Sequence, residues 1–243
     1  MMTALLSVEN VSKRFRGLVA VDRVSFSIRQ GEIFAVIGPN GAGKTTLFNV
    51  IAGVFAPDDG TIAFNGARID GETPDRVCRS GIGRTFQIVR PFPGLSVEDN
   101  VIVGALLHRP DVAAARRHAH DILTRLDLFP KRNDLASTLT LPDRKRLEVA
   151  RALATDPKLL LLDEVMAGLR PSETDRIVAI LTELNRETGL TILLIEHVMR
   201  AVMALASRVL VLHHGAKIAE GTPAQVVREP AVIHSYLGAE VLE

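Results

Sequence analysis

The chain has 243 residues, and its 29 Lys and Arg nearly balance its 28 Asp and Glu, so no strong field favours nucleic acid or an anionic membrane. The longest apolar runs, residues 159–162 and 192–195, are too short to span a bilayer, and charges near the N-terminus interrupt any signal-peptide core. The single cysteine, Cys78, excludes an internal disulfide and suits a reducing compartment. We therefore expect a soluble cytoplasmic protein with one substantial core.

The first motif along the chain is a glycine-rich loop at residues 38–46, which fits the pattern G-x-x-x-x-G-K-[ST] without a mismatch. Glycines let successive backbone N–H groups turn toward phosphate oxygens. Lys44 can reach the β- and γ-phosphates, and the Thr45 hydroxyl can ligate Mg²⁺. The alternative is a turn that binds nothing. The residues expected to contact nucleotide are Gly38, Asn40, Gly41, Ala42, Gly43, Lys44, Thr45 and Thr46.

The flanks of this loop favour the binding interpretation. The apolar run 33–37 predicts a buried parallel strand before the loop. Leu47, Val50 and Ile51 recur at helical spacing after it, and Gly53 is a plausible end for that helix. Phosphates in the loop would lie at a helix N-terminus, whose partial positive charge favours anions. The sequence therefore predicts a nucleoside triphosphate site.

Two further apolar strands end in polar residues of chemical interest. Residues 159–162 lead into Asp163 and Glu164, and residues 191–195 lead into His197. In an open parallel sheet, ligands bind outside the carboxyl ends of the strands. Asp163 is expected to help hold Mg²⁺, and Glu164 is a candidate base for the attacking water. The alternative, a pair of solvated carboxylates, is weakened by the phosphate loop upstream.

The remaining segments define the expected architecture. A helix over about 171–187 precedes the strand at 191–195, and residues 208–212 and 217–220 predict a strand–turn–strand edge. Between residues 89 and 155 helical patterns predominate, with a capping signal at Ser96 and Asp99. We expect an α/β fold: a P-loop NTPase core (about 1–88 and 156–243), whose mostly parallel sheet has an antiparallel edge, with an inserted helical subdomain (about 89–155).

From residue 6 to 238 the chain resembles the ATP-binding cassette ATPases, the energising subunits of membrane transporters. The resemblance implies that ATP and Mg²⁺ are the ligands. It implies that Gln87 is the glutamine that senses Mg²⁺ and the γ-phosphate, and that His197 is the switch histidine that contacts the γ-phosphate. It also implies that Phe15 stacks on adenine, which needs only a flat aromatic face. Taken singly these residues are weak signals, but their order and spacing support one another.

Within that family the chain is most similar to the ATP-binding subunits of bacterial branched-chain amino acid importers, through residues 81–87, 163–169 and 236–238. This resemblance implies transport of branched-chain amino acids or related small polar solutes. It implies transmembrane permease subunits as partners, a periplasmic solute-binding protein as an indirect one, and no nucleic acid. The chain would then lie at the cytoplasmic face of the inner membrane, attached through the permease.

One departure from the family pattern concerns its signature segment, usually Leu-Ser-Gly-Gly-Gln, which caps ATP bound by the opposite subunit of a dimer. Here the segment includes Thr140, Leu141, Pro142 and Asp143. Thr140 keeps a hydroxyl, but Pro142 removes a glycine and its N–H donor. Asp143 is expected to put a negative charge where phosphate approaches. These residues suit an ordinary helix start better than ATP.

This departure leads to a hypothesis about assembly. Arg170 also stands where many family members carry an aspartate that communicates across the dimer. The chain is therefore expected to work as half of an asymmetric heterodimer with a paralogous ATPase, although pairing with itself stays open. Phe92 or its neighbours are expected to contact a short cytoplasmic helix of the permease, with a tucked aromatic in a solvent loop as the alternative. Two other functions stay open, a non-transport cassette ATPase and a regulatory ATP-binding module.

Overall fold

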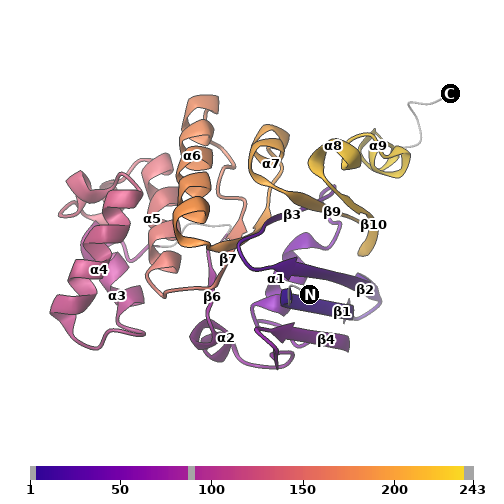
Figure 1. The fold of residues 1–243 in the computed structure, drawn as a ribbon, viewed down its shortest axis with the longest axis horizontal. Coiled ribbons are helices and arrows are strands. Elements are labelled where there is room, and N and C mark those ends of the chain that lie inside the picture. Colours follow the sequence, from indigo (N-terminus) through magenta and orange to yellow (C-terminus); the bar gives the residue numbers. More distant parts are fainter. Residues whose placement is uncertain (1–3, 87–90, 238–243) are drawn as a thin grey trace. The chain divides into compact units, whose positions relative to one another are not determined.

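The computed structural model describes residues 4–86 and 91–237. It contains two compact units, Met1–Val77 with Thr191–Glu243, and Cys78–Leu190 (Figure 1). Within the described ranges, no helix combines the length and the apolar character needed to cross a membrane.

The first unit contains an antiparallel sheet in the order β2-β1-β4-β5. Its strands are β1 (Ala4–Phe15), β2 (Leu18–Arg29), β4 (Asp59–Phe64) and β5 (Ala67–Arg68). Buried and exposed side chains partly alternate along β2, as expected for a strand with one face toward a core. Phe15, the expected adenine contact, is the last residue of β1.

The same unit contains strands in the order β10-β9-β3-β8; in Figure 1, β3 is indigo, and β9 and β10 are yellow. They are β3 (Ile33–Ile37), β8 (Thr191–Ile195), β9 (Arg208–His213) and β10 (Ala216–Gly221). Strand β3 pairs in parallel with β8 and β9, and β10 pairs antiparallel with β9. Strands β3 and β8 are buried along their whole length, which explains their continuous apolar sequences. The predicted parallel core with an antiparallel edge is confirmed.

The helices of the first unit come between or after its strands in the chain. They are α1 (Lys44–Ile51), α7 (Met199–Leu205), α8 (Pro223–Val226) and α9 (Pro230–Leu237), while α2 (Pro74–Ser80) crosses the boundary in sequence between the units. Helix α1 ends at Ile51 with Ala52 as its C-cap, and Gly53 follows with φ +74°. Gly53, the predicted end of the helix, is therefore the residue after the C-cap, and it has the left-handed conformation that glycine adopts without strain.

The second unit pairs two strands in parallel and carries most of the helices. The strands are β6 (Ile82–Arg84) and β7 (Leu159–Asp163); the helices are α3 (Val97–Ala105), α4 (Val112–Arg125), α5 (Leu141–Leu153) and α6 (Pro171–Thr188), with short 3₁₀ turns at Phe129–Lys131 and Ala136–Thr138. Helices α3 to α5 come between β6 and β7 in the chain. They fall inside the segment 89–155 for which helical structure is predicted.

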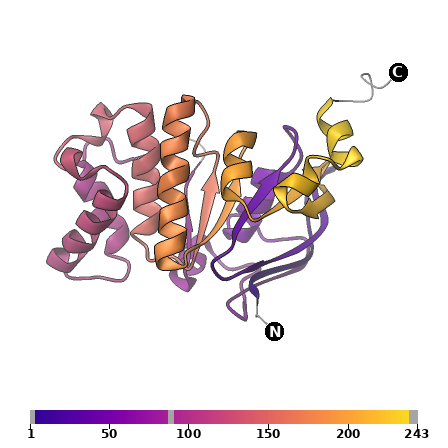
Figure 2. The ribbon, with the colours of Figure 1, turned by 45° about the horizontal axis from the view of Figure 1, so that its top comes forward.

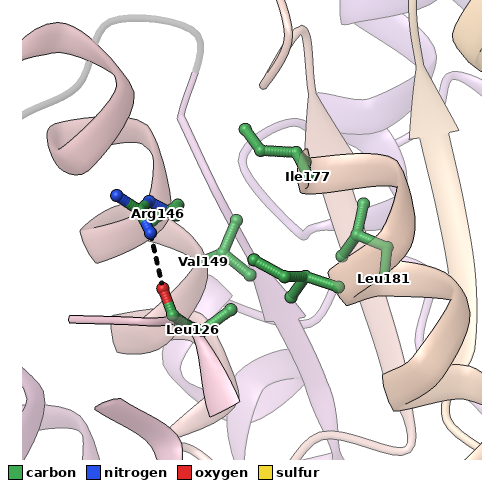
Figure 3. A pocket seen from close by; sticks show the side chains of 6 residues that line it. Leu126, Arg146, Val149, Ile177 and Leu181 are labelled. Atoms are coloured by element: carbon green, nitrogen blue, oxygen red, sulfur yellow. Dashed lines mark hydrogen bonds between the residues drawn. The ribbon is translucent and has the colours of Figure 1, made fainter. Parts of the chain in front are cut away.

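Local sequence explains where these helices begin. The Ser96 hydroxyl accepts a hydrogen bond from the Asp99 N–H at 3.0 Å, as the capping signal predicts. Helix α5 begins at Leu141, and Pro142 occupies its first turn, where a missing N–H is tolerated. Helices α5 and α6 lie side by side (Figure 2). Val149 of α5 and Ile177 and Leu181 of α6 line a small apolar cavity (Figure 3).

Candidate nucleotide-binding site

The predicted phosphate loop lies between β3 and α1 in the first unit. Gly38, Gly41 and Gly43 all have positive φ, at +148°, +77° and +98°. A Cβ atom on Gly38 would lie 2.1 Å from the Leu212 carbonyl oxygen, and one on Gly43 would lie 2.1 Å from that of Ala20. Glycine is therefore required at both positions. The loop segment comprises Gly38, Pro39, Asn40, Gly41, Ala42 and Gly43, and the first turn of α1 contains Lys44, Thr45 and Thr46.

Lys44 begins α1 and is buried. Its Nζ donates hydrogen bonds to the carbonyl oxygens of Gly38 at 2.7 Å and Pro39 at 2.8 Å. These bonds hold the ammonium group against the loop at the N-terminus of the helix, where partial positive charge also gathers. The loop thus brings a cation and a helix N-terminus together, the combination that binds phosphate in such loops.

The turn between β9 and β10 supports the phosphate loop from the side. The Gly215 N–H donates to the Ala42 carbonyl at 3.1 Å, and the Gly215 carbonyl accepts from the Asp22 N–H at 2.9 Å. The phenol of Tyr236 in α9 is also hydrogen-bonded to the backbone of Gly38; burial raises the pKa of the phenol, and this bond opposes the rise. Sequence reasoning missed these contacts because they join segments about 170 to 200 residues apart.

Strand β8 places His197 at the same edge of the sheet as the phosphate loop. Val36 of β3 pairs with Ile195 of β8, so Gly38 and His197 each lie two residues beyond this pair. His197 is exposed. Since the two strands are parallel, the phosphate loop and His197 leave the sheet at the same edge.

Phe15 lies at the end of β1 in the first unit, with more than a third of its surface exposed. Its ring meets that of Phe55 edge to face at a centroid distance of 5.2 Å. The edge contact fixes the ring while the residue stays accessible, which suits stacking on a base. Its adenine-binding role stays a prediction. Gln87 lies outside the described residues.

The acidic strand end belongs to the second unit. Asp163 is the last residue of β7 and is only 1% exposed. Its Oδ2 accepts a hydrogen bond from Nη2 of Arg84 at 3.4 Å, whereas its buried Oδ1 has no hydrogen-bond partner among the described residues. Burial raises the pKa of Asp163, and the charge of Arg84 opposes this rise. A buried carboxylate oxygen without a donor fits a role as a ligand of Mg²⁺.

Glu164, the next residue, has a φ of +51°, which is uncommon for a residue other than glycine. The buried ammonium of Lys145 in α5 donates to the Glu164 carbonyl oxygen at 2.9 Å, and the Ala167 N–H also reaches this oxygen at 3.2 Å. Such conformations persist where the surroundings hold them. Helix α5 therefore holds the backbone of the candidate base through Lys145, a contact that sequence reasoning missed.

The signature segment forms the start of α5 with Thr140 as its N-cap, so the expectation of an ordinary helix start is confirmed. The expectation for Asp143 needs correction. Its carboxylate is buried and paired with Lys131 and Arg146, and it accepts a hydrogen bond from the Thr140 hydroxyl at 2.8 Å. Burial raises the pKa of Asp143, but the bonds from Lys131 and Thr140 and the nearby cations outweigh it and hold the pKa below its ordinary value.

This arrangement changes what the segment offers a phosphate. The negative charge of Asp143 is compensated inside the second unit, so strong repulsion of an incoming phosphate is not expected. The Thr140 hydroxyl instead donates to Asp143. Leu141 is exposed, and Arg146 also donates to the Leu126 carbonyl at 3.1 Å (Figure 3). The side chains of Thr140, Asp143 and Arg146 thus bond to one another.

Comparisons with known proteins identify the class. The family model described as ABC transporter matches residues 21–167, and the one described as branched-chain amino acid ATP-binding cassette transporter matches residues 216–241. The chain is 40% identical to the high-affinity branched-chain amino acid transport ATP-binding protein LivG of Escherichia coli K12, covering 98% of this chain and 99% of LivG. It is 37% identical to the corresponding protein BraF of Pseudomonas aeruginosa, with the same coverage.

Among solved structures, the ADP conformation of MJ1267, an ATP-binding cassette of an ABC transporter, matches with a TM-score of 0.88 and 32% identity. The match covers 97% of this chain and 99% of MJ1267. The chain therefore belongs to the ABC transporter family of ATP-binding cassette ATPases, and the resemblance seen in its motifs is confirmed.

Proposed function

We propose that the chain is the ATP-hydrolysing subunit that energises an ABC importer of branched-chain amino acids or related small polar solutes. It would act at the cytoplasmic face of the membrane, attached to transmembrane permease subunits and served indirectly by a periplasmic solute-binding protein. The proposal rests on the phosphate loop, in which Lys44 is hydrogen-bonded to the Gly38 and Pro39 carbonyls. It also rests on the match of residues 216–241 to the branched-chain amino acid ATP-binding cassette transporter model.

The residues of the first unit would bind the nucleotide. The loop N–H groups and Lys44 hold the phosphates, Phe15 stacks on adenine, and His197 contacts the γ-phosphate. The positive φ values of the loop glycines support the first role, because they let N–H groups converge on an anion. The position of His197 two residues beyond a strand pair shared with the loop supports the last role.

The second unit would supply the hydrolytic groups. Thr45 of the first unit together with Asp163 and Gln87 would hold Mg²⁺, which when bound neutralises charge on the phosphates. Glu164 would orient the attacking water and accept its proton. The unpartnered oxygen of Asp163 and the fixed backbone of Glu164 support these assignments.

Reconstitution in vesicles with the permease subunits tests the proposal. Phosphate release should rise when solute-binding protein carrying a branched-chain amino acid is present, and Lys44→Ala should abolish the rise. Lys158→Ala, which removes an exposed lysine outside the loop, is the matched control and should act like wild type. A chain that binds ATP but never hydrolyses it with any partner would instead be a regulatory module.

We also infer that the working unit is an asymmetric heterodimer with a paralogous cassette. Two features support this inference: the Thr140 hydroxyl already donates to Asp143, and the proline at position 142 has no N–H to offer a phosphate. In the mixed dimer, Glu164→Gln in this chain should abolish most turnover, whereas the equivalent change in the paralog should remove little. Equal losses from the two changes would contradict the asymmetry.

Phe92 is the proposed contact for a permease helix. Its backbone is held on both sides by Asn100, which accepts from the Phe92 N–H at 2.8 Å and donates to its carbonyl at 3.1 Å. The ring lies 4.8 Å from the Arg151 guanidinium and stays exposed. A held but exposed aromatic suits an interface anchor. Phe92→Asp should uncouple ATPase activity from transport, whereas Val112→Asp, at another exposed apolar residue of this unit, should not.

A further inference from the structure

Arg84 is a charged residue at the end of a buried strand, and the function proposed above gives it no role. In the parallel pair of β6 and β7, Arg84 stands opposite Leu161, so its side chain can reach the end of β7. Its Nη2 lies 3.4 Å from Oδ2 of Asp163. The two side chains are 11% and 1% exposed. A cation is thus buried beside the carboxylate that is proposed to bind metal.

The surroundings hold this cation in place. The next residue, Thr85, donates its N–H to the Leu161 carbonyl at 2.9 Å, and its hydroxyl accepts from the Asp163 N–H at 3.0 Å. These bonds fix the end of β6 to the end of β7 at Leu161 and at Asp163. The exposed ring of Phe86 lies 5.6 Å from the guanidinium carbon. Arg84 is therefore held near Asp163 by its own backbone and by a cation–π contact.

The ion pair nevertheless leaves the carboxylate short of donors. Its contact of 3.4 Å is longer than the roughly 2.7–2.9 Å of a strong charge-assisted hydrogen bond. Oδ1 has no hydrogen-bond partner among residues 4–86 and 91–237. Arg84 thus compensates the charge of Asp163 without occupying both of its oxygens, and a metal ion at Oδ1 would lie in the field of a fixed positive charge.

We propose that Arg84 is a positioning residue that sets the metal affinity of Asp163. In the metal-free site it compensates the buried carboxylate, and its repulsion keeps a divalent cation from binding there alone. The negative phosphates of a nucleotide offset this repulsion, so metal binds together with nucleotide. This inference rests on the proposed function, because it takes Asp163 as a metal ligand.

Metal binding to the whole chain, measured separately from turnover, tests the role of Arg84. The probe is Mn²⁺, whose free concentration is read by electron paramagnetic resonance at mildly alkaline pH, with and without a non-hydrolysable ATP analogue. Wild-type protein should bind Mn²⁺ weakly alone and far more tightly with the analogue. Arg84→Met should tighten binding of Mn²⁺ alone by about tenfold or more, because it removes a fixed charge facing a divalent ion.

Matched variants separate charge from structure. Arg84→Lys keeps the charge and should retain the wild-type affinity for Mn²⁺ alone, even if it loses the guanidinium geometry. Arg151→Met removes another arginine that pairs with a buried carboxylate, Glu148 at 3.1 Å, and should also leave this affinity unchanged. If Arg84→Met does not fold, Arg84→Gln takes its place. A folded neutral variant with unchanged or weaker Mn²⁺ binding would overturn the inference.

A separate variant tests the assumption that Asp163 is a metal ligand. Asp163→Asn should abolish the gain in Mn²⁺ binding that the analogue produces. If it does not, Asp163 is not the metal ligand and the proposed site is wrong. If it does, while the neutral Arg84 variants behave like wild type, the site stands and only the role of Arg84 fails.

Discussion

Replacing Asp143 by asparagine tests the buried charge cluster at the start of α5. The Asp143 side chain is 5% exposed and accepts from the Arg146 guanidinium, which is 12% exposed, from Lys131, which is 43% exposed, and from the Thr140 hydroxyl. Asparagine keeps the shape of the side chain but removes its charge. Two cations that now face a carboxylate would then face a neutral amide.

The expected magnitude follows from these exposures. A hydrogen bond between buried charged groups contributes about 1.5–3 kcal/mol, which applies to Arg146. The half-exposed Lys131 adds about 0–1 kcal/mol, and the Thr140 bond adds about 0.5–1.5 kcal/mol. Asparagine keeps one acceptor oxygen, and Arg146 keeps its bond to the Leu126 carbonyl. We therefore expect Asp143→Asn to lower the free energy of unfolding by about 2–4 kcal/mol.

Thermal unfolding followed by circular dichroism measures this loss as a fall in melting temperature of about 4–15 °C. The matched control is Glu183→Gln, which breaks a pair with Arg186 at the same spacing of three residues in α6, but with side chains 64% and 73% exposed. The control should change stability by less than about 0.5 kcal/mol. If both variants lost equally little, the carboxylate of Asp143 would not be buried and paired as described.

The remaining predictions concern acid stability, the candidate base and the phosphate loop. The pKa of Asp143 in the folded chain is below its ordinary value of 3.8, so its stabilisation is complete above about pH 5 and is lost as pH falls through the lowered pKa. The gap in melting temperature between wild type and Asp143→Asn should therefore be constant from pH 7 to about 5 and close only in stronger acid. A gap that closed near pH 6 would refute this. Lys145→Met should slow phosphate release about tenfold with little change in ATP affinity, since it frees the backbone of Glu164; unchanged turnover would argue against a positioning role. Gly38→Ala should weaken binding of a fluorescent ATP analogue by at least about tenfold, because its Cβ would meet the Leu212 carbonyl. The control Gly66→Ala, at φ +81° and with nothing within 4 Å of the added Cβ, should affect stability alone. Equal binding by the two variants would count against the loop geometry.

The local parts of the structure followed from the sequence because each has a local cause. The continuous apolar runs predict β3 and β8, since strands buried on both faces have no polar positions. The phosphate loop is determined by glycines with positive φ, and α3 begins where Ser96 caps it. These features depend on neighbours within a few residues, so periodicity and spacing are enough to predict them.

The contacts missed from the sequence depend on pairing and direction. Arg84 reaches Asp163 only because β6 and β7 pair in a particular register, 79 residues apart. For Asp143, comparison with the family pattern gave the position of the residue but not the direction of its side chain. The spacing of three residues to Arg146 was a usable signal, because such residues are neighbours on a helix. Lys131, in a separate 3₁₀ turn, offered no such signal.

The corrected role of Asp143 also sharpens the proposed heterodimer. If its charge faced the phosphate, the altered signature would act by repulsion, and Asp143→Asn would restore ATP capture by this segment. In the structure the carboxylate is compensated, and the Thr140 hydroxyl donates to it, so the deficit is a lack of available donors. Pro142 contributes no N–H in either case. Neutralising Asp143 should therefore leave the paralog's ATP site slow, and restoring it requires a glycine at position 142 together with a hydroxyl freed from Asp143.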